Sequence, residues 1–423
     1  MENYQQTIDY LYRLEYSGIK LGLENVSRLL KFLGNPQDKW PAVHIAGTNG
    51  KGSTAAFIYT ILREAGFKVG LYTSPHLLDF SERIQINEKK ISWDVIVAYT
   101  RKLKNQIEHQ QATFFEATTA LAFAYFADQQ VDIAVIETGL GGRLDATNLV
   151  HPLVTIITSI SEDHQQYLGS TLPQIAFEKA GIIKTGIPCI TIQQEADILP
   201  ILQEKAVEQN SPFFVIKPAD HLKIISETLQ GSTFDLLLPQ RSLQNLKILL
   251  AGDHQIGNAS LAVASVLNLK SFPCSEQQIR AGLSKTDWPG RFQHIAENPL
   301  TILDVAHNPA GFKKTLAFIR SKMPGKRIWA IVGLSKDKDY QKIADILSQY
   351  VFKVGLVSGF SIRILDPAIM WSELKNRSKP VEKFADITEA YSAFRALIPA
   401  DDLLLIIGSH YLAGEFIKKI QIS

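Results

Sequence analysis

Cysteine is nearly absent from this chain: only Cys189 and Cys274 occur among its 423 residues. Their separation in the sequence matches no metal-binding or redox motif, so a disulfide framework has no support. We expect both side chains to be reduced thiols, as in a cytoplasmic protein.

A charge excess of one sign and long apolar runs are also missing. The 44 basic and 42 acidic residues leave a net charge of +2, and no Lys/Arg block is long enough for a nucleic-acid or membrane-surface site. The most apolar stretch, 117–127, falls short of the roughly 20 residues that cross a bilayer and predicts a buried helix. Residues 1–6 lack the basic and apolar regions of a secretory signal, so we expect no leader.

The composition is that of an ordinary globular protein, with 46% hydrophobic and 20% charged residues. The length allows two large domains or about three smaller ones. Short β-branched runs alternate with stretches of helical periodicity, which is typical of an α/β fold around a parallel sheet. The first strands, whose carboxyl ends should line one crevice, are expected at Ala42–Ala46, Val69–Tyr72, 133–136 and 154–158.

A second series of such units predicts a separate C-terminal α/β domain. Proline-punctuated segments from 187 to 250, with a hairpin-rich edge at 224–238, are expected on the rim of the first domain. Pro289 and Gly290 interrupt both patterns, so we place the boundary between residues 288 and 289. The strands of the second domain are expected at 301–305, Ile328–Val332, 353–357 and Leu403–Ile407.

The most informative segment is the sequence GTNGKGS at 47–53, which follows a buried-strand pattern and precedes a helix expected to begin at Ser53 or Thr54. Glycines let backbone N–H groups close around phosphate oxygens, and the helix N-terminus adds a positive dipole end. Lys51 would neutralise phosphate charge, and the hydroxyl after it would hold Mg²⁺. The glycine spacing differs from that of the usual P-loop, but the segment still predicts nucleotide binding.

Polar side chains also follow other predicted strands. Glu137 comes directly after an apolar run and is the best candidate metal ligand, because a carboxylate ending a buried strand needs a charge partner. The alternative is that Glu137 is a solvated carboxylate at the end of a strand and binds no metal. Ser74 before Pro75 is equally a turn start, and a lone His164 is more often structural than a ligand. The glycines at 139–142 lack the complete dinucleotide-binding motif, which argues against a Rossmann cofactor site.

Six motifs, spread over nearly the whole chain, resemble the folylpolyglutamate synthase/dihydrofolate synthase family of the Mur ligase superfamily. They are GTNGKGS at 47–53, TSPHL at 73–77, ETGLGGRLDATN at 137–148, EKAGI at 178–182, PGR at 289–291 and DVAHNP at 304–309. The resemblance implies an ATP-dependent amide ligase of the α/β class. It also implies an N-terminal P-loop nucleotide-binding domain with a mostly parallel sheet (1–288) and a smaller C-terminal Rossmann-like α/β domain (289–423), with glutamate bound between them.

The matching motifs imply roles for individual residues. Lys51, Lys179 and His307 are the expected catalytic residues. Lys179 is the position that this family carbamylates, with an ordinary surface lysine as the alternative; for His307 the alternative is a plain Asn-Pro turn. Mg²⁺ would be held, directly or through water, by Ser74, Glu137 and His164. ATP would be bound by Thr48, Asn49, Gly50, Lys51, Gly52, Ser53, Asn258, Arg291 and Asp304.

A pterin substrate would occupy three further segments. Phe114 and Phe115 would stack on a flat ring, and the start of a core helix is an equal alternative. The LGLE sequence at 21–24 and the intact RLDATN loop at 143–148 resemble bifunctional bacterial members, which also act on dihydropteroate. The matching positions are Lys20, Leu21, Gly22, Leu23, Thr113, Phe114, Phe115, Glu116, Leu144, Asp145 and Ala146.

The resemblance therefore implies that ATP and Mg²⁺ are used to join L-glutamate to 7,8-dihydropteroate and to tetrahydrofolate or its polyglutamates, through an acyl phosphate. Within the superfamily, the alternatives are polyglutamylation alone and a Mur-type cell-wall peptide ligase. Outside it, they are a regulatory NTPase and a nicotinamide dehydrogenase. We expect a monomer, because no long apolar seam is evident. We also expect a cytoplasmic protein without nucleic-acid or membrane partners.

Overall fold

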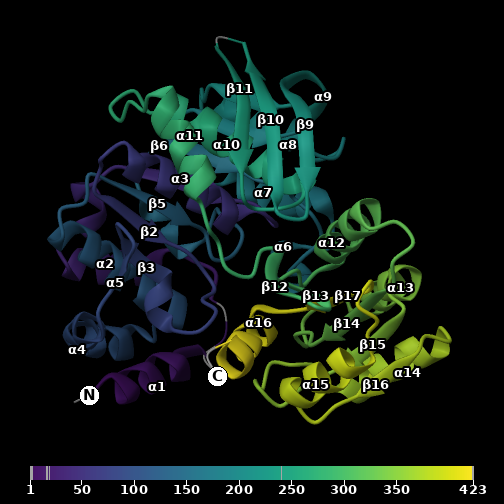
Figure 1. Ribbon diagram of the computed structural model, residues 1–423. Coiled ribbons are helices and arrows are strands. Elements are labelled where there is room, and N and C mark those ends of the chain that lie inside the picture. Colours follow the sequence, from purple (N-terminus) through teal and green to yellow (C-terminus); the bar gives the residue numbers. More distant parts are fainter. Residues whose placement is uncertain (1–2, 16–17, 19, 240, 422–423) are drawn as a thin grey trace.

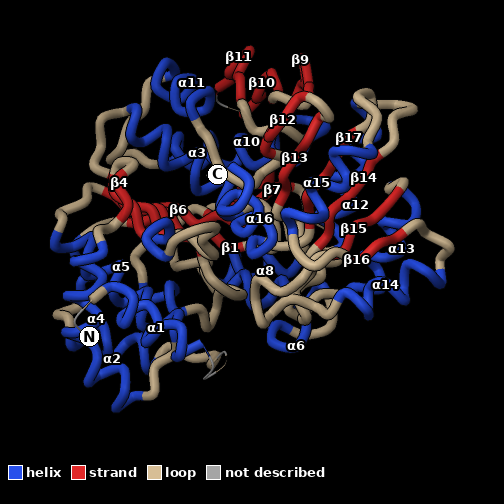
Figure 2. The backbone as a smooth tube through the Cα atoms, turned by 60° about the horizontal axis from the view of Figure 1, so that its bottom comes forward, coloured by secondary structure: helices blue, strands red, loops and turns tan. Residues whose placement is uncertain are grey.

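The computed structural model describes residues 3–15, 18, 20–239 and 241–421. Two large sheets lie on opposite sides of the molecule, and a smaller sheet lies beyond the first (Figure 1). Helices surround both large sheets (Figure 2). This is the α/β class that the sequence predicts.

The N-terminal sheet has the strand order β4-β3-β2-β5-β1-β6-β7-β8. It is parallel from β2 to β8, and the antiparallel strands β3 and β4 form one edge. The strands are β1 (Ala42–Ala46), β2 (Val69–Tyr72), β3 (Ile84–Ile86), β4 (Lys89–Lys90), β5 (Ile133–Glu137), β6 (Pro152–Ile157), β7 (Cys189–Ile192) and β8 (Phe213–Ile216).

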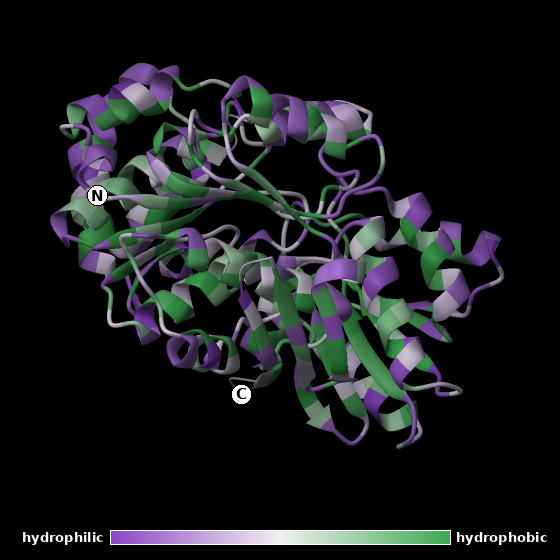
Figure 3. Ribbon diagram, turned by 90° about the horizontal axis from the view of Figure 1, so that it is seen from above, coloured by the Kyte–Doolittle hydropathy of each residue, from purple (hydrophilic) through white to green (hydrophobic). Residues whose placement is uncertain are grey.

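Alternate residues of these strands pack against different helix layers. On β5, Ile133 and Val135 join one hydrophobic cluster while Ala134 and Ile136 join another. Both faces are covered, so the central strands of this sheet are mostly apolar (Figure 3). The first layer contains α3 (Lys51–Glu64), α10 (Asp253–Asn268) and α11 (Glu276–Lys285). The second contains α1 (Tyr4–Glu15), α2 (Glu24–Phe32), α4 (Trp93–Gln110) and α5 (Phe114–Asp128).

The remaining helices of this half lie in connections or near the β6 and β7 end. A buried cluster joins α7 and α8 to residues of β6 and β7. These helices are η1 (Pro36–Lys39), η2 (Phe80–Arg83), η3 (Ala146–Leu149), α6 (Gln165–Leu168), α7 (Leu172–Ala180), α8 (Leu199–Glu208) and α9 (Pro218–His221).

The small sheet is antiparallel, with the order β11-β10-β9. Its strands are β9 (Leu222–Thr228), β10 (Gly231–Leu238) and β11 (Arg241–Ile248). Phe234 and Leu236 of β10 are fully buried in the same cluster as α10 and α11. The hairpin expected at 224–238 is therefore present, but the expectation of an edge is wrong, because these strands form a sheet of their own over the helix layer.

The C-terminal sheet has the order β12-β13-β17-β14-β15-β16, parallel except for β12. Its strands are β12 (Gln293–Glu297), β13 (Leu300–Asp304), β14 (Ile328–Val332), β15 (Lys353–Leu356), β16 (Val381–Lys383) and β17 (Leu403–Ile407). The cluster on one face includes α12 (Pro309–Lys322), α13 (Tyr340–Tyr350) and α14 (Pro367–Asn376). The cluster on the other includes α15 (Ile387–Leu397), α16 (His410–Phe416) and the π-helical turn η4 (Ile417–Gln421).

The predicted strands are confirmed, four of them with the expected bounds and the others shifted by one or two residues. The apolar stretch at 117–127 lies in the buried helix α5. The expected helix start at Ser53 or Thr54 is wrong, since α3 begins at Lys51. Gly50 has a φ of 94°, so the chain turns from the loop directly into the helix. Within the described part of the chain, no helix combines the length and apolarity needed to cross a bilayer.

We predict that Gly282→Ala destabilises the protein by about 1–3 kcal/mol, the usual cost of overpacking. A Cβ at Gly282 of α11 would lie 2.5 Å from the Cα of Ile61 in α3. Backbone atoms cannot give way cheaply, and the gain of up to about 1 kcal/mol in helix propensity does not offset the clash. Urea unfolding measures the change.

The control is Ser284→Ala at an exposed position of the same helix, which should alter stability by less than about 0.5 kcal/mol. An unchanged stability of Gly282→Ala would show that α11 does not hold α3 at this distance.

Candidate active site

The carboxyl ends of the parallel strands in both large sheets border one cavity of about 730 Å³. The loops after β1, β2, β5 and β6 line it from one side, and residues at the ends of β13, β14 and β17 line it from the other. Every candidate residue from the sequence lines this cavity except Leu23. Leu23 precedes α2 and packs against the hydrophobic core instead.

The loop between β1 and α3 is held closely by its neighbours. Thr48 donates its backbone N–H to the carbonyl of Ser159 at 2.8 Å, which ties the loop to the end of β6. A Cβ at Gly50 would lie 2.3 Å from Oδ1 of Asn258, so α10 contacts the loop directly. Lys51 donates from Nζ to the carbonyls of Gly47, at 3.1 Å, and Thr48, at 3.2 Å. The lysine charge therefore lies over the loop where phosphate oxygens would bind.

Glu137, the last residue of β5, is buried and accepts one hydrogen bond at Oε2 from the backbone N–H of Ser74, at 3.1 Å. Burial raises the pKa of Glu137, although the charges of Lys51 and Arg291 oppose this rise. His164 lies on the same cavity, and burial lowers its pKa to about 4, which leaves a neutral imidazole at pH 7. A buried carboxylate, a hydroxyl and a neutral imidazole are groups that accept a divalent cation.

The described residues contain no group of three His, Cys, Asp or Glu side chains arranged to hold a metal. A cation beside Glu137 would therefore need hydroxyl, water or phosphate oxygens to complete its coordination. This donor set suits Mg²⁺, which retains waters and binds through one or two carboxylates together with substrate phosphates.

Lys179, near the end of α7, is 3% exposed, and its Nζ donates to the carbonyl of Gly47 at 2.7 Å. Burial, together with the charge of Lys51, lowers the pKa of Lys179 to about 7. The alternative of an ordinary surface lysine is therefore wrong. A large share of this side chain is a neutral amine near pH 7, and a neutral amine is a nucleophile.

Asp163 links the N-terminal loops to the C-terminal sheet region. Its Oδ1 accepts from Nζ of Lys338 at 2.7 Å, and both side chains are 7% exposed. Nε2 of His307 lies 3.5 Å from its other oxygen. Burial alone would raise the pKa of Asp163, but its cationic and hydrogen-bonding neighbours hold that pKa well below the usual range. Beside it, the amides of Asn49 and Asn308 face each other, with the Nδ2 of Asn308 3.0 Å from Oδ1 of Asn49 and the reverse contact at 3.4 Å.

Arg291 and Asp304 lie on the C-terminal side of the cavity. Burial lowers the pKa of Arg291, and one of its Nη atoms lies 3.3 Å from Nε2 of His410. Asp304 accepts backbone N–H groups from Phe292 and from Ala306, each at 2.8 Å. Asp304 thus fixes the two chain segments that flank the cavity.

The wall expected to hold a flat ring is built on the start of α5. Thr113 and Glu116 form a capping box in which each side chain accepts a backbone N–H from the other residue. Phe114 is in the core, stacked with Tyr12 at a centroid distance of 5.8 Å, and it also lines the cavity. Phe115 is half-buried on the same cavity. Phe114 therefore begins a core helix, as one alternative expects, and stacking of the two rings on a flat ligand stays a prediction.

The loop at 143–148 is shaped by hydrogen bonds to Asp145. Asp145 is buried and accepts backbone N–H groups from Leu140, at 2.7 Å, and from Thr147, at 3.0 Å. Burial raises the pKa of Asp145, whereas these hydrogen bonds lower it. Its carboxylate therefore shapes the loop that presents Leu144 and Ala146 to the cavity.

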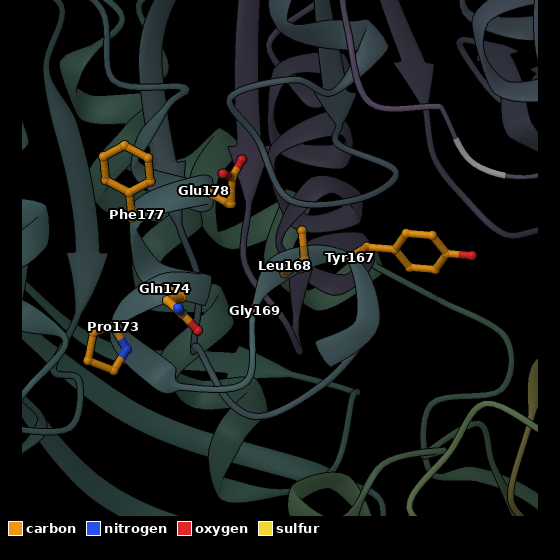
Figure 4. A pocket seen from close by; sticks show the side chains of 7 residues that line it. All are labelled: Tyr167, Leu168, Gly169, Pro173, Gln174, Phe177 and Glu178. Atoms are coloured by element: carbon orange, nitrogen blue, oxygen red, sulfur yellow. The ribbon is translucent and has the colours of Figure 1, made fainter.

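A second hollow of about 450 Å³ lies over α6 and α7 (Figure 4). Phe177 is 54% exposed there, with the guanidinium of Arg143 5.5 Å from its ring centroid. Two residues, Tyr167 and Leu168, line both hollows. The full lining is Tyr167, Leu168, Gly169, Pro173, Gln174, Phe177 and Glu178.

The sequence offered weak signals for several residues of the site. Asn308 belongs to the DVAHNP motif and Asp163 directly precedes His164, but the roles of both depend on contacts with the other half of the chain. Lys338 and Arg83 belong to no recognised motif. No motif or strand pattern in the sequence points to either residue.

Two family models match the chain: the Mur ligase middle domain at residues 45–266 and the Mur ligase glutamate ligase domain at residues 290–410. The dihydrofolate synthase/folylpolyglutamate synthase of Bacillus subtilis is 35% identical, with 99% of each chain covered. The structure of Mycobacterium tuberculosis folylpolyglutamate synthase complexed with ADP and AMPPCP gives a TM-score of 0.89 at 30% identity, covering 98% of each chain. Escherichia coli FolC in complex with DHPP and ADP gives 0.87 at 29% identity, again covering 98% of each chain.

The lowered pKa of Lys179 predicts a pH-dependent stability. Between its folded pKa of about 7 and its usual 10.5, the unfolded chain binds a proton that the folded chain lacks, so stability rises with pH in this window. Below pH 7 the full burial penalty is present. Lys179→Met should therefore increase the free energy of unfolding most at pH 6. The lost hydrogen bond to Gly47 reduces this increase by about 1 kcal/mol.

Urea unfolding at pH 6 and pH 9 in carbonate-free buffer measures this difference, which should shrink at the higher pH. Lys89→Met, at an exposed position of β4, reports the effect of the same replacement away from the cavity. A stability gain of Lys179→Met that is the same at both pH values would contradict a buried amine of lowered pKa.

Proposed function

Because the chain belongs to the dihydrofolate synthase/folylpolyglutamate synthase family of Mur ligases, we propose that it joins L-glutamate to the carboxylate of a pterin-containing acceptor at the expense of ATP. One observation carries the proposal: the phosphate loop, the buried Glu137 and residues of the C-terminal sheet line a single cavity. An amide ligase needs three reactants held together, and a cavity between two α/β units provides the space.

The acceptors are 7,8-dihydropteroate, which becomes dihydrofolate, and tetrahydrofolate or its polyglutamates, which gain one glutamate. Relatives named for both activities support this pair of acceptors. The intact loop at 143–148, fixed by Asp145, lies on the same cavity as Phe114 and Phe115. Together they offer a flat, partly apolar place for a pterin or aminobenzoate ring.

The reaction has two steps. A carboxylate oxygen of the acceptor attacks the γ-phosphorus of ATP and ADP leaves, which gives an acyl phosphate. The amine of L-glutamate then attacks the acyl carbon, loses a proton, and displaces phosphate. The cavity walls position the reactants and limit access of water, which would otherwise hydrolyse the acyl phosphate.

Residues of the phosphate loop and of the C-terminal side share the binding of ATP. Lys51 and Arg291 place positive charge where the phosphoryl group transfers. Asn258 touches the loop at Gly50, and Asp304 positions the segment that carries Arg291. The other loop residues proposed to bind phosphates are Thr48, Asn49, Gly52 and Ser53.

Ser74, Glu137 and His164 are proposed to hold Mg²⁺, directly or through water. The raised pKa of Glu137 and its single backbone hydrogen bond support this role, because a cation would stabilise its ionised form. Mg²⁺, when bound, neutralises charge on the phosphate oxygens. His307 is proposed to border the glutamate position, with Nδ1 on the carbonyl of Val305 and Nε2 near Asp163.

Lys179 is proposed to carry a carbamate. A neutral amine attacks CO₂ at carbon and releases one proton, and the pKa of about 7 makes that amine available. The product is an anion close to Lys51, where two cations otherwise repel each other. An anion at this place would orient Lys51 and help to attract a metal.

We propose that the enzyme divides between residues 288 and 289 and acts as a monomer in the cytoplasm. The end of α11 at Lys285 and the start of β12 at Gln293 support the division. The unpaired thiols Cys189 and Cys274 suit a reducing compartment.

The decisive experiment measures ADP release and product mass with Mg·ATP and L-glutamate. 7,8-Dihydropteroate and a reduced folate are supplied separately, and both should gain one glutamate per ADP released. Activity on the folate alone would reduce the function to polyglutamylation. Activity on neither acceptor, in protein that binds ATP, would refute the proposal and direct attention to cell-wall precursors.

Lys51→Ala is the matched loss-of-function variant in this assay. Removing one preorganised charge at the transferring phosphoryl group should lower kcat by roughly 100- to 1000-fold. Lys89→Ala removes an exposed lysine and should retain full activity.

The carbamate predicts a signal in ¹³C NMR spectra. Protein equilibrated with ¹³C-bicarbonate at pH 8 should show one slowly exchanging carbonyl resonance that is absent from Lys179→Met. The same variant should have a lower kcat. A wild-type spectrum without that resonance would remove the carbamate from the mechanism and leave the ligase assignment intact.

A further inference from the structure

Arg83, the last residue of η2, is a buried cation without an acidic partner. The residue is 7% exposed and lines the cavity, yet none of the ion pairs among the described residues involves it. Buried charges in proteins are normally paired, because an unpaired one bears the full cost of leaving water. A buried, unpaired guanidinium on a substrate cavity therefore indicates an anion that arrives with a ligand.

The orientation of this guanidinium is fixed from two directions. Nε donates to Nδ1 of His76 at 2.8 Å. Since Nδ1 accepts, the ring proton lies on Nε2, which faces the hydroxyl of Tyr12 at 3.1 Å. The guanidinium carbon also lies 5.1 Å from the ring centroid of Phe114.

These contacts leave one edge of the guanidinium available. With Nε engaged by His76 and Phe114 against the planar group, only the two Nη atoms remain, and neither has a hydrogen-bond partner among the described residues. Two parallel N–H groups on that edge match the two oxygens of a carboxylate. Arg83 and Glu137 line the same cavity.

We propose that Arg83 binds the carboxylate of the acceptor end-on through its two Nη atoms and aims it at the γ-phosphate. The inference rests on the proposed ligase function and names the group that selects an acceptor bearing a carboxylate. Tyr12 and His76 are positioning residues that act through Arg83. Lys51 and Arg291 are the cations assigned to the phosphates, whereas Arg83 lies on Phe114, the wall assigned to the acceptor ring.

The test compares two ligands that differ only in the carboxylate. One is 7,8-dihydropteroate and the other is its analogue with aniline in place of p-aminobenzoate. Both are titrated into full-length protein holding Mg²⁺ and a non-hydrolysable ATP analogue. Arg83→Gln should weaken binding of dihydropteroate by roughly 10- to 100-fold, the worth of a charged hydrogen bond, and leave the analogue unchanged. Arg83→Lys should lie between Arg83→Gln and the wild type.

Arg63→Gln is the matched control. Arg63 also lies over an aromatic ring, 5.3 Å from the centroid of Tyr59, but it is paired with Glu88 and does not line the cavity. The Arg63→Gln variant should bind dihydropteroate and the analogue as the wild type does. Nucleotide affinity confirms that each variant is folded.

Steady-state kinetics separates positioning from structural damage. Tyr12→Phe removes the hydroxyl that faces His76 and should raise KM for the acceptor several-fold, while KM for ATP and for L-glutamate remain as in the wild type. A uniform rise in all three constants would contradict the positioning role.

Three results would overturn the inference: equal weakening of both ligands by Arg83→Gln, weakening of the nucleotide alone, or no change. If the wild type makes no product with any acceptor, the ligase function and the inference fail together. Normal wild-type turnover with an unaffected Arg83→Gln would remove the inference alone.

Discussion

The carbonyl oxygen of Gly47 accepts hydrogen bonds from two lysines, Lys51 at 3.1 Å and Lys179 at 2.7 Å. Burial, together with repulsion by Lys51, lowers the pKa of Lys179 to about 7. The rest of the site follows from this concentration of positive charge. Anions are needed to neutralise this charge. Glu137 and Asp163 lie on the same cavity, and phosphates or a carbamate would add further negative charge there, with a metal beside them.

The second unit is part of this electrostatic arrangement. Lys338 neutralises Asp163, and the amides of Asn49 and Asn308 join the phosphate loop to the start of α12. A change in the position of the C-terminal sheet would therefore move Asn49 in the phosphate loop. The loop that binds phosphate is held in shape by both halves of the molecule, so the geometry of transfer depends on how they are packed.

The sequence predicted those features that local physics determines. Apolar runs predicted the central strands, because a strand buried on both faces needs consecutive apolar residues. The glycines with Lys51 predicted the phosphate loop, because a positive φ favours glycine. The candidate residues selected by motif resemblance also line the cavity, with Leu23 as the exception. The small sheet of β9–β11 and the roles of Lys338 and Arg83 were not predictable in the same way. They depend on packing between distant segments, and a single basic residue has no periodicity that reveals its partner.

The paired amides of Asn49 and Asn308 have a consequence for how this sequence changes over time. The two residues lie 259 positions apart, and each side chain can both donate to and accept from the other. Replacing Asn308 by an apolar residue would leave Oδ1 of Asn49 without its donor in a part-buried place. In an alignment of homologues, positions 49 and 308 should therefore covary, so that a contact between the two domains appears as a correlation between two sequence positions.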